Sequence, residues 1–145
     1  MDKYAINQLS VFVENKKGEL NQVTSILSDE NISIKNILLV DSTDFGILRL
    51  LLEDTESAKE ALSSGGFVAK VNKVFAVRMQ DKIGSFHQVV GILTTEDINI
   101  LYTYAYREKD QGVFVFKVDN SDFDKAIKVL QENQLELVEN EHLCL

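Results

Sequence analysis

The sequence predicts an α+β protein made of two β-α-β-β-α-β units in tandem, and an internal repeat is the first observation behind this prediction. Gly18 aligns with Gly84 at an offset of 66 positions (84 − 18), and the same offset carries Gly46 onto Gly112. The offset also superposes apolar pairs: Val23 and Val89, Ile26 and Ile92, Leu27 and Leu93, Ile32 and Ile98, Ile34 and Ile100. A period of this length indicates a duplicated small domain rather than a solenoid.

The second observation is the change of hydrophobic period within the first repeat. Apolar residues recur at every second position from Leu9 to Val13, which is typical of a strand, and at helical spacing from Leu20 to Leu27. Thr55 is the expected N-cap of a second helix, and Gly65 is expected to end it in the left-handed conformation. The predicted elements are strands at 9–13, 32–41, 45–53 and 67–71, with helices at 20–30 and 55–63.

The second repeat has the same order of elements. Its predicted strands are 73–80, 98–107, 112–119 and 135–139, and its helices are 85–96 and 122–132. Asn133 takes the place of Gly65, and asparagine tolerates the left-handed region. Two right-handed β-α-β crossovers per repeat produce an antiparallel sheet with both helices on one face, which is the ferredoxin-like fold. We expect two such domains, 1–72 and 73–145, with no linker between them.

Composition and charge exclude several function classes. The 145 residues carry a formal net charge of −8, which argues against nucleic-acid phosphates or anionic membranes as the main partner. The single cysteine, Cys144, cannot form an internal disulfide, so a cytoplasmic location fits best. The sequence shows no signal peptide or transmembrane pattern, no Cys/His zinc pattern and no glycine-rich phosphate motif, so we expect no metal and no cofactor.

Candidate catalytic groups are few. His87 lies on a predicted helix and has Asn21 as its repeat counterpart; an exposed helix histidine is the simpler interpretation, because a catalytic base needs an orienting partner. His142 and Cys144 form a pair of a kind that can activate a thiolate, but a chain end holds such a geometry poorly. We expect no catalytic residue and no enzyme activity.

Tyrosines at 102, 104 and 106 share one face of a predicted strand. Aromatic side chains on such a sheet can stack RNA bases. Because no basic cluster flanks these tyrosines, cross-strand packing is the preferred interpretation.

The loop after the first strand of each repeat is the strongest candidate for a binding site. Asn15 or Asp81 stands at the strand end, and Gly18 or Gly84 stands just before a helix. Unpaired N–H groups at a helix start attract a carboxylate, and a polar side chain beside them accepts hydrogen bonds from an ammonium. An α-amino acid carries both groups. The alternative is a structural turn that needs glycine for its conformation alone.

These segments resemble the ACT-domain family, and within it the small stand-alone tandem ACT proteins. The resemblance is carried by residues 9–27 and 74–93, by the strand starts at Asn31-Ile32 and Asp97-Ile98, and by Asp44-Phe45-Gly46. It covers essentially the whole chain. It implies a non-catalytic regulatory protein that binds a small ligand, most often an amino acid, at interfaces between ACT units and acts on a regulated enzyme partner.

The resemblance also implies the ligand-binding residues, one set in each repeat. Loop and helix positions would line the two sites, and strand residues beside them would offer backbone groups: Asn15, Gly18, Glu19, Leu20 and Ile34 in the first, and Asp81, Gly84, Ser85, Phe86 and Ile100 in the second. The two sites are expected to be unequal, because Asn15 is neutral and Asp81 is anionic.

Two other functions remain open at this point. One is a protein–protein interaction module that binds no ligand and only pairs chains, and the other is a small enzyme that uses His87. Exposed sheet edges and apolar residues such as Phe12 on the open sheet face predict a homodimer.

Overall fold

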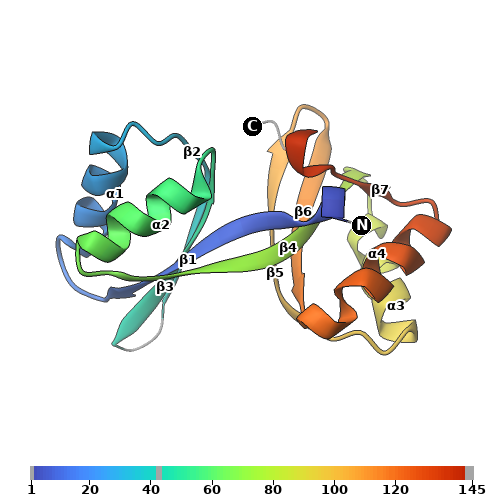
Figure 1. Ribbon diagram of the computed structural model, residues 1–145. Helices are drawn as coiled ribbons and strands as arrows, with labels where there is room; N and C mark the ends of the chain where they lie inside the picture. Colours follow the sequence, from blue (N-terminus) through green and yellow to red (C-terminus); the bar gives the residue numbers. More distant parts are fainter. Residues whose placement is uncertain (1, 42–43, 143–145) are drawn as a thin grey trace. The chain divides into compact units, whose positions relative to one another are not determined.

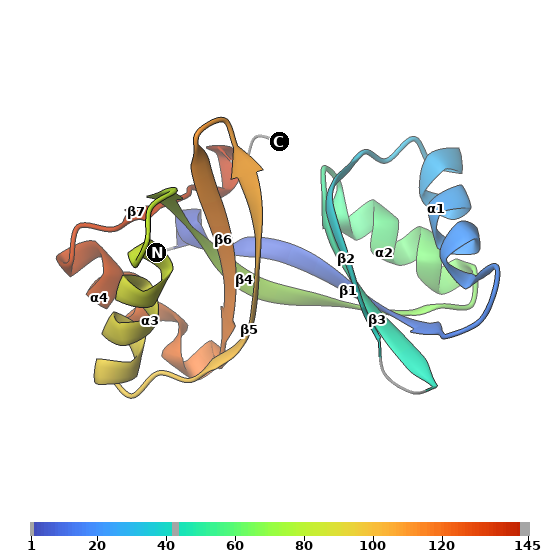
Figure 2. The ribbon, with the colours of Figure 1, turned by 180° about the vertical axis from the view of Figure 1, so that it is seen from behind.

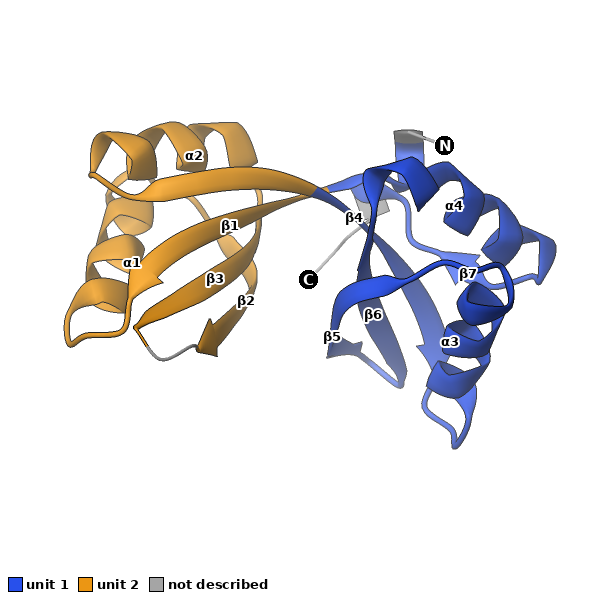
Figure 3. Cartoon of the chain, turned by 90° about the horizontal axis from the view of Figure 1, so that it is seen from below, with its two compact units in different colours: residues 1–6, 73–145 blue, residues 7–72 orange. Residues whose placement is uncertain are grey.

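The computed structural model describes residues 2–41 and 44–142. The chain divides into two compact units. The N-terminal unit comprises residues 7–72 (orange in Figure 3), and the C-terminal unit comprises residues 1–6 and 73–145 (blue in Figure 3). Residues 42–43 and Cys144 lie outside the described residues, so the turn predicted at 42–44 and the His142–Cys144 pair are not described in full.

The N-terminal unit follows the predicted order of elements. Its strands run β2-β3-β1-β4, and its two helices lie on one face of that sheet (Figures 1 and 2). β3 pairs antiparallel with both β1 and β2. The elements are β1 (Ile6–Glu14), α1 (Glu19–Asp29), β2 (Ile34–Asp41), β3 (Phe45–Leu52), α2 (Thr55–Ser64) and the first part of β4 (Val68–Gln80).

The C-terminal unit repeats this arrangement with β5 at one edge. The order is β4-β6-β5, β7 pairs with β4, and these pairings are antiparallel. The elements after β4 are α3 (Ser85–Thr95), β5 (Ile100–Glu108), β6 (Gln111–Val118), α4 (Phe123–Glu132) and β7 (Glu136–Leu137). Short 3-10 helices occur at Asp2–Tyr4, Asn120–Asp122 and Asn140–His142. The predicted α+β, ferredoxin-like class is confirmed.

Each unit has a core between its helices and its sheet. In the N-terminal unit, Leu9, Val11 and Val13 of β1 are buried against Val23 and other residues of α1 and α2, as the period of two predicted. In the C-terminal unit, Phe75 of β4 stacks on Phe116 of β6, with ring centroids 5.5 Å apart. Full burial of one such side chain contributes ~1.5–3 kcal/mol, so these faces fix the helices on the sheets.

The first helix of each unit ends in the same way. Asn31 and Asp97, at the repeat offset, have φ of 57° and 59°. The next residue, Ile32 or Ile98, donates its N–H back to Leu27 or Leu93 at 3.0 and 2.9 Å. Asn and Asp tolerate the left-handed region better than other non-glycine residues, which explains the Asn/Asp-Ile pattern at these strand starts.

The left-handed residues predicted after the second helices are wrong by one position. Gly65 has φ −80° and Asn133 has φ −94°, whereas the left-handed residues are Gly66 (φ 92°) and Gln134 (φ 62°). α2 ends one residue later than predicted, at Ser64, whereas α4 ends at Glu132 as predicted.

The predicted N-cap of α2 is also wrong by one position. Asp54 is the cap, and its Oδ1 accepts a hydrogen bond from the Ser57 N–H at 3.1 Å. Thr55 is the first helical residue. An aspartate at the N-cap satisfies one of the unpaired helix donors and opposes the helix dipole.

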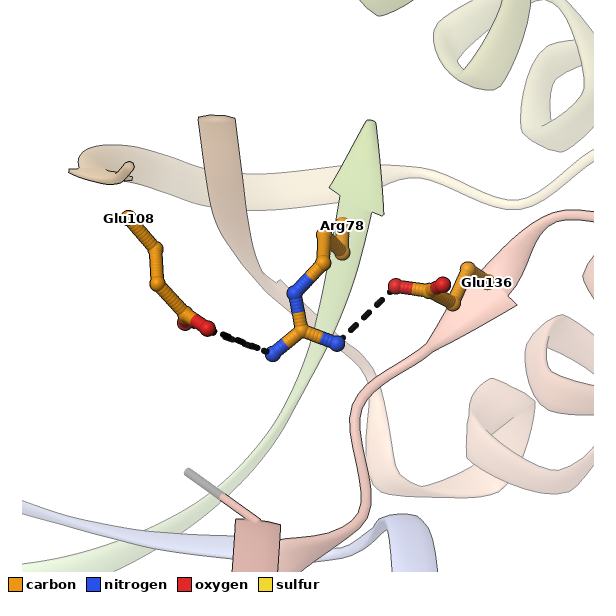
Figure 4. A network of polar contacts seen from close by, with 3 residues as sticks. All are labelled: Arg78, Glu108 and Glu136. Atoms are coloured by element: carbon orange, nitrogen blue, oxygen red, sulfur yellow. Dashed lines mark hydrogen bonds and ion pairs between the residues drawn. The ribbon is translucent and has the colours of Figure 1, made fainter. Parts of the chain in front are cut away.

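The last strand is shorter than predicted. β7 contains only Glu136 and Leu137, which pair with Arg78 and Val77 of β4. The Arg78 guanidinium bonds Glu136 at 2.9 Å and Glu108 of β5 at 3.2 Å, so one side chain connects three strands (Figure 4). These ion pairs hold a strand that has little backbone pairing of its own.

Residues 2–6 belong to the C-terminal unit, although the repeat placed them with the first domain. The Tyr4 hydroxyl accepts a hydrogen bond from Gln131 of α4 at 3.2 Å. Lys3 pairs with Glu139 at 3.4 Å, and Tyr4 and Ala5 pack against the core of this unit. The repeat locates the two units, but the first residues of the chain pack with the C-terminal unit and not with the N-terminal unit that follows them in sequence.

Candidate functional site

The loop after the first strand has the same backbone in both units. Gly18 and Gly84 are the N-caps of α1 and α3, with φ of 94° and 91°. Lys16 and Lys82 donate their N–H groups to Glu14 and Gln80, both at 2.9 Å. A positive φ at both caps explains why each copy has glycine here.

Backbone N–H groups in the first turn of the helices beside these loops are available as hydrogen-bond donors. In α3 the Ser85 N–H bonds the Lys82 carbonyl at 3.2 Å, and the first N–H that bonds back into the helix is that of Gln88, to Gly84 at 3.0 Å. Neither helix receives a side-chain cap from the described residues. The N–H groups of Phe86 and His87 therefore have no partner within their own helix and can bind a carboxylate.

A cavity lies beside each loop, and the two cavities are equivalent. The cavity in the C-terminal unit has a volume of about 240 Å³, and the one in the N-terminal unit about 80 Å³. Every residue of the smaller cavity has its counterpart, at the offset of 66, in the larger one: Val13, Glu14, Asn15, Lys16, Glu19, Leu20, Leu39, Asp41 and Gly46 match Met79, Gln80, Asp81, Lys82, Ser85, Phe86, Ala105, Arg107 and Gly112. Tyr106 and Phe114 complete the larger cavity.

The C-terminal cavity has a charged mouth and an aromatic wall. Asp81 Oδ2 accepts a hydrogen bond from Arg107 Nη1 at 2.7 Å, and both side chains are about two-thirds exposed, at 64% and 63%. The Asp81 carboxylate raises the pKa of Arg107 further above its usual range. Phe86 of α3 packs on Phe114 of β6, with ring centroids 4.8 Å apart. The cavity thus presents both charge signs beside apolar surface.

Tyr106 is a buried polar group in the wall of this cavity. Its hydroxyl is inaccessible to solvent and has no hydrogen-bond partner among the described residues. Burial is the main cause that raises the pKa of this phenol, and the charge of Glu108 raises it further, while Arg78 opposes the shift. Tyr106 is therefore a neutral hydroxyl across the physiological pH range.

The N-terminal cavity has the opposite charge balance. Lys16 pairs with Glu14 at 2.9 Å and lies 3.9 Å from Glu19, whose side chain is only 14% exposed. Hydrogen bonding to Glu14 is the main cause that raises the pKa of Lys16. Asp41 stands where the other cavity has Arg107. One lysine thus faces three carboxylates here, whereas Arg107 and Lys82 face one carboxylate in the larger cavity.

The structure brings together six of the ten predicted binding residues, three in each cavity: Asn15, Glu19, Leu20, Asp81, Ser85 and Phe86. Gly18 and Gly84 set the helix starts but do not line the cavities, and an added Cβ at either meets nothing within 4 Å. Ile34 and Ile100 pack against the cores of their units. Ile34 also borders a separate hollow beside the end of α1.

Sequence reasoning missed the side of each cavity formed by the strand hairpin. Arg107, Tyr106 and Phe114 come from β5 and β6, and Asp41 and Gly46 from β2 and β3. The repeat offered a signal, because the offset that pairs Gly18 with Gly84 also pairs Gly46 with Gly112.

Other candidate groups do not assemble into a second site. His87 is an exposed residue of α3. Within residues 2–41 and 44–142, no three His, Cys, Asp or Glu side chains cluster in a way that could hold a metal ion. None of the helices in the described part of the chain combines the length and apolar character needed to cross a membrane.

Comparison with solved structures places this architecture among known proteins. Protein BT0572 from Bacteroides thetaiotaomicron is similar, with 31% sequence identity and a TM-score of 0.91, over 99% of this chain and 98% of that one. The ligand-free regulatory subunit of aspartate kinase from Thermus thermophilus shares the fold at 12% identity and a TM-score of 0.64, over 90% of this chain and 93% of that one. Aspartokinase III from E. coli, in complex with aspartate and ADP, shares it at 21% identity and a TM-score of 0.57, over 89% of this chain and 32% of that one.

Comparison of sequences gives the same result at the level of the family. No curated protein matches the chain. The family model described as an ACT domain pair matches residues 4–145, which includes both units and both cavities. The chain therefore belongs to the ACT domain pair family.

Proposed function

We propose that this protein is a non-catalytic regulator that binds a free α-amino acid in the cavity of the C-terminal unit. The observation that carries the proposal is the Asp81–Arg107 ion pair at the mouth of that cavity, beside the start of α3. An α-amino acid carries one positive and one negative group on the same carbon atom. Arg107 and the first N–H groups of α3 suit its carboxylate, and Asp81 suits its ammonium.

The ligand's charged groups can replace the Asp81–Arg107 ion pair at a low cost in free energy. An exposed ion pair contributes only ~0–1 kcal/mol, so opening this one costs little. Each charged side chain then gains a charged partner from the ligand. Phe86, Phe114 and Met79 offer apolar surface for the ligand's side chain. A cavity of about 240 Å³ is smaller than the ~300–1,000 Å³ of sites for drug-sized ligands, which suits an amino acid better than a nucleotide.

The N-terminal cavity is the weaker site in this proposal. It is a third as large, and its three carboxylates around Lys16 repel the ligand's carboxylate. Asp41 stands at the position of Arg107, so this cavity has no cation there to bind the ligand's carboxylate. We therefore expect one ligand per chain at moderate concentration.

Regulation is proposed from the family to which the chain belongs. Proteins of similar fold include a regulatory subunit of aspartate kinase. We infer that this chain is a cytoplasmic homodimer that senses an amino acid and passes the signal to an enzyme partner.

The test is calorimetry of the whole protein against the proteinogenic amino acids. We expect at least one to bind, and Arg107→Gln and Asp81→Asn to weaken that binding at least tenfold. Lys109→Gln is the matched control, because it removes the same charge from the same hairpin outside the cavity. An absence of binding to any amino acid at millimolar concentration would reject the proposal and favour a ligand-free interaction module.

A further inference from the structure

The two cavities differ in volume, although equivalent positions line both. The cavity in the C-terminal unit measures about 240 Å³ and the one in the N-terminal unit about 80 Å³. The strand before the loop and the helix after it do not explain the difference, because Met79 and Phe86 of the larger cavity are bigger than their counterparts Val13 and Leu20. The additional space must come from positions at which the larger cavity has the smaller residue.

Two of the paired positions carry a smaller residue in the larger cavity. Ser85 replaces Glu19 at the helix start, and Ala105 replaces Leu39 on the edge strand. The first exchange removes a charged group, whereas the second removes apolar bulk. Ala105 therefore decides how much room the C-terminal cavity has for an apolar group.

In the N-terminal unit, the leucine at this position covers the neighbouring strand. A Cβ built on Gly46, which also lines that cavity, lies 3.2 Å from Leu39 Cδ1. In the C-terminal unit, the three atoms closest to a Cβ built on Gly112 all belong to the Phe114 ring, the nearest at 3.0 Å. None of them belongs to Ala105. The space that Leu39 occupies in one unit is therefore open in the other.

An aromatic ring borders this open space. Ala105 and Phe114 lie directly opposite each other in the pairing of β5 with β6, where side chains come into contact. Phe114 in turn packs on Phe86, with ring centroids 4.8 Å apart, and Met79 also lines the cavity. The wall beside Ala105 is thus apolar, and these three neighbouring side chains carry no hydrogen-bond donor.

We propose that Ala105 determines the ligand specificity of the C-terminal cavity and that the ligand is an α-amino acid with an uncharged, apolar side chain larger than a methyl group. This inference rests on the amino-acid binding of the proposed function and names the class of amino acid. Asp81 and Arg107 bind the ammonium and the carboxylate at the mouth of the cavity. The ligand's side chain packs against Phe114, in the space that Ala105 leaves open.

The first measurement compares amino acids of matched shape by calorimetry on the whole protein. Leucine and asparagine have the same arrangement of non-hydrogen atoms, but asparagine ends in a polar amide. Leucine should bind at least roughly tenfold more tightly, because an amide that leaves water without new hydrogen bonds loses free energy. Leucine should also bind more tightly than alanine by at least tenfold, since each buried methylene adds roughly a factor of four.

The second measurement fills the open space. Ala105→Leu gives the C-terminal cavity the residue that Leu39 supplies in the other one. Leucine should bind this variant at least roughly tenfold more weakly than the wild type. Alanine should bind both equally, because Asp81 and Arg107 are unchanged. Thr103→Leu is the matched control: it adds a leucine to the same face of β5 outside the cavity and should leave the binding of leucine unchanged.

The outcomes distinguish this inference from the proposed function. No binding of any amino acid would reject both. Leucine binding no tighter than asparagine binding, or an equal loss of alanine and leucine binding in folded Ala105→Leu, would overturn the role of Ala105 while amino-acid binding stands. Ala105→Val, with a residue that strands favour, replaces Ala105→Leu if the leucine variant does not fold.

Discussion

Two pairs of residues related by the repeat have the same left-handed backbone conformation in both units. Gly18 and Gly84 have φ near 90° and start α1 and α3, and Asn31 and Asp97 have φ near 58° and follow their ends. Each pair uses residues that tolerate the left-handed region at low cost. The four positions fix where the first helix of each unit starts and stops.

Substitution of the cap glycine should separate backbone strain from crowding. Gly84→Ala puts a Cβ on a residue with φ 91°, and nothing lies within 4 Å of that Cβ. The free energy of unfolding should fall by about 1 kcal/mol from strain alone. Gly91→Ala, inside α3 with equally open space, should raise it by about 0.5–1 kcal/mol. Urea unfolding measures both, and changes of the same sign would contradict this account.

The N-cap residue of α2 makes the stability of the protein depend on pH, in a direction that follows from its pKa. Hydrogen bonds from the Ser57 backbone and hydroxyl lower the pKa of Asp54 below its ordinary value of 3.8. The stabilisation is therefore fully present above pH 3.8 and is lost as the pH falls through the lower, folded-state pKa.

Asp54→Ser keeps a capping oxygen but removes the titration. The melting temperatures of wild type and variant should accordingly differ more at neutral pH than at about pH 3. A difference that stays constant over this range would show that the carboxylate charge does not contribute.

At the scale of elements, the Arg78 network decides whether β7 stays on the sheet. Arg78 is 18% exposed and binds carboxylates on two other strands, while β7 itself has two residues (Figure 4). Hydrogen bonds to charged groups are worth more than neutral ones, and partial burial reduces screening by solvent.

Loss of the Arg78 guanidinium should lower the stability of the protein, whereas loss of the exposed Arg107 guanidinium should not. Arg78→Gln should lower the free energy of unfolding by roughly 1–2 kcal/mol. Arg107→Gln should leave the melting temperature nearly unchanged, because its pair with Asp81 is exposed. Thermal melts compare the two. Equal losses would mean that Arg107 has a structural role, which would also change the interpretation of its effect on binding.

At the scale of the whole molecule, the start of the chain stabilises the unit formed by its end. Tyr4 bonds Gln131 and packs against the core of the C-terminal unit. The first residues of the chain are therefore part of the domain that begins again at Lys73.

Amide hydrogen exchange of a Tyr4→Ala variant should show that residue 4 stabilises the C-terminal unit. Amide protection should fall in α4, which carries Gln131, and should stay unchanged in α1, which belongs to the N-terminal unit. Gln131→Ala should reproduce a smaller part of the effect, since it removes the hydrogen bond but keeps the Tyr4 ring. Loss of protection in α1 as well would show that residue 4 stabilises both units.

The sequence by itself determined the duplication, the order of the elements and the position of the loops, because periodicity, helix ends and turns depend on residues near one another along the chain. Of the binding residues that the family resemblance implied, Asn15, Glu19, Leu20 and their counterparts line the cavities. The left-handed residues predicted at Gly65 and Asn133 lie one position further on, at Gly66 and Gln134, because the choice between neighbouring cap positions depends on how the helix packs.

Only the tertiary structure decided which charges meet. Arg107 lies 26 residues from Asp81 in sequence, and only the fold brings the end of β5 beside the loop after β4. The same pairing puts Asp41 at the other cavity, so two loops of similar sequence acquire opposite charge balances. Residues 2–6 joined the C-terminal unit for the same reason. Contacts between distant segments depend on the register and packing of whole strands, which no local pattern encodes.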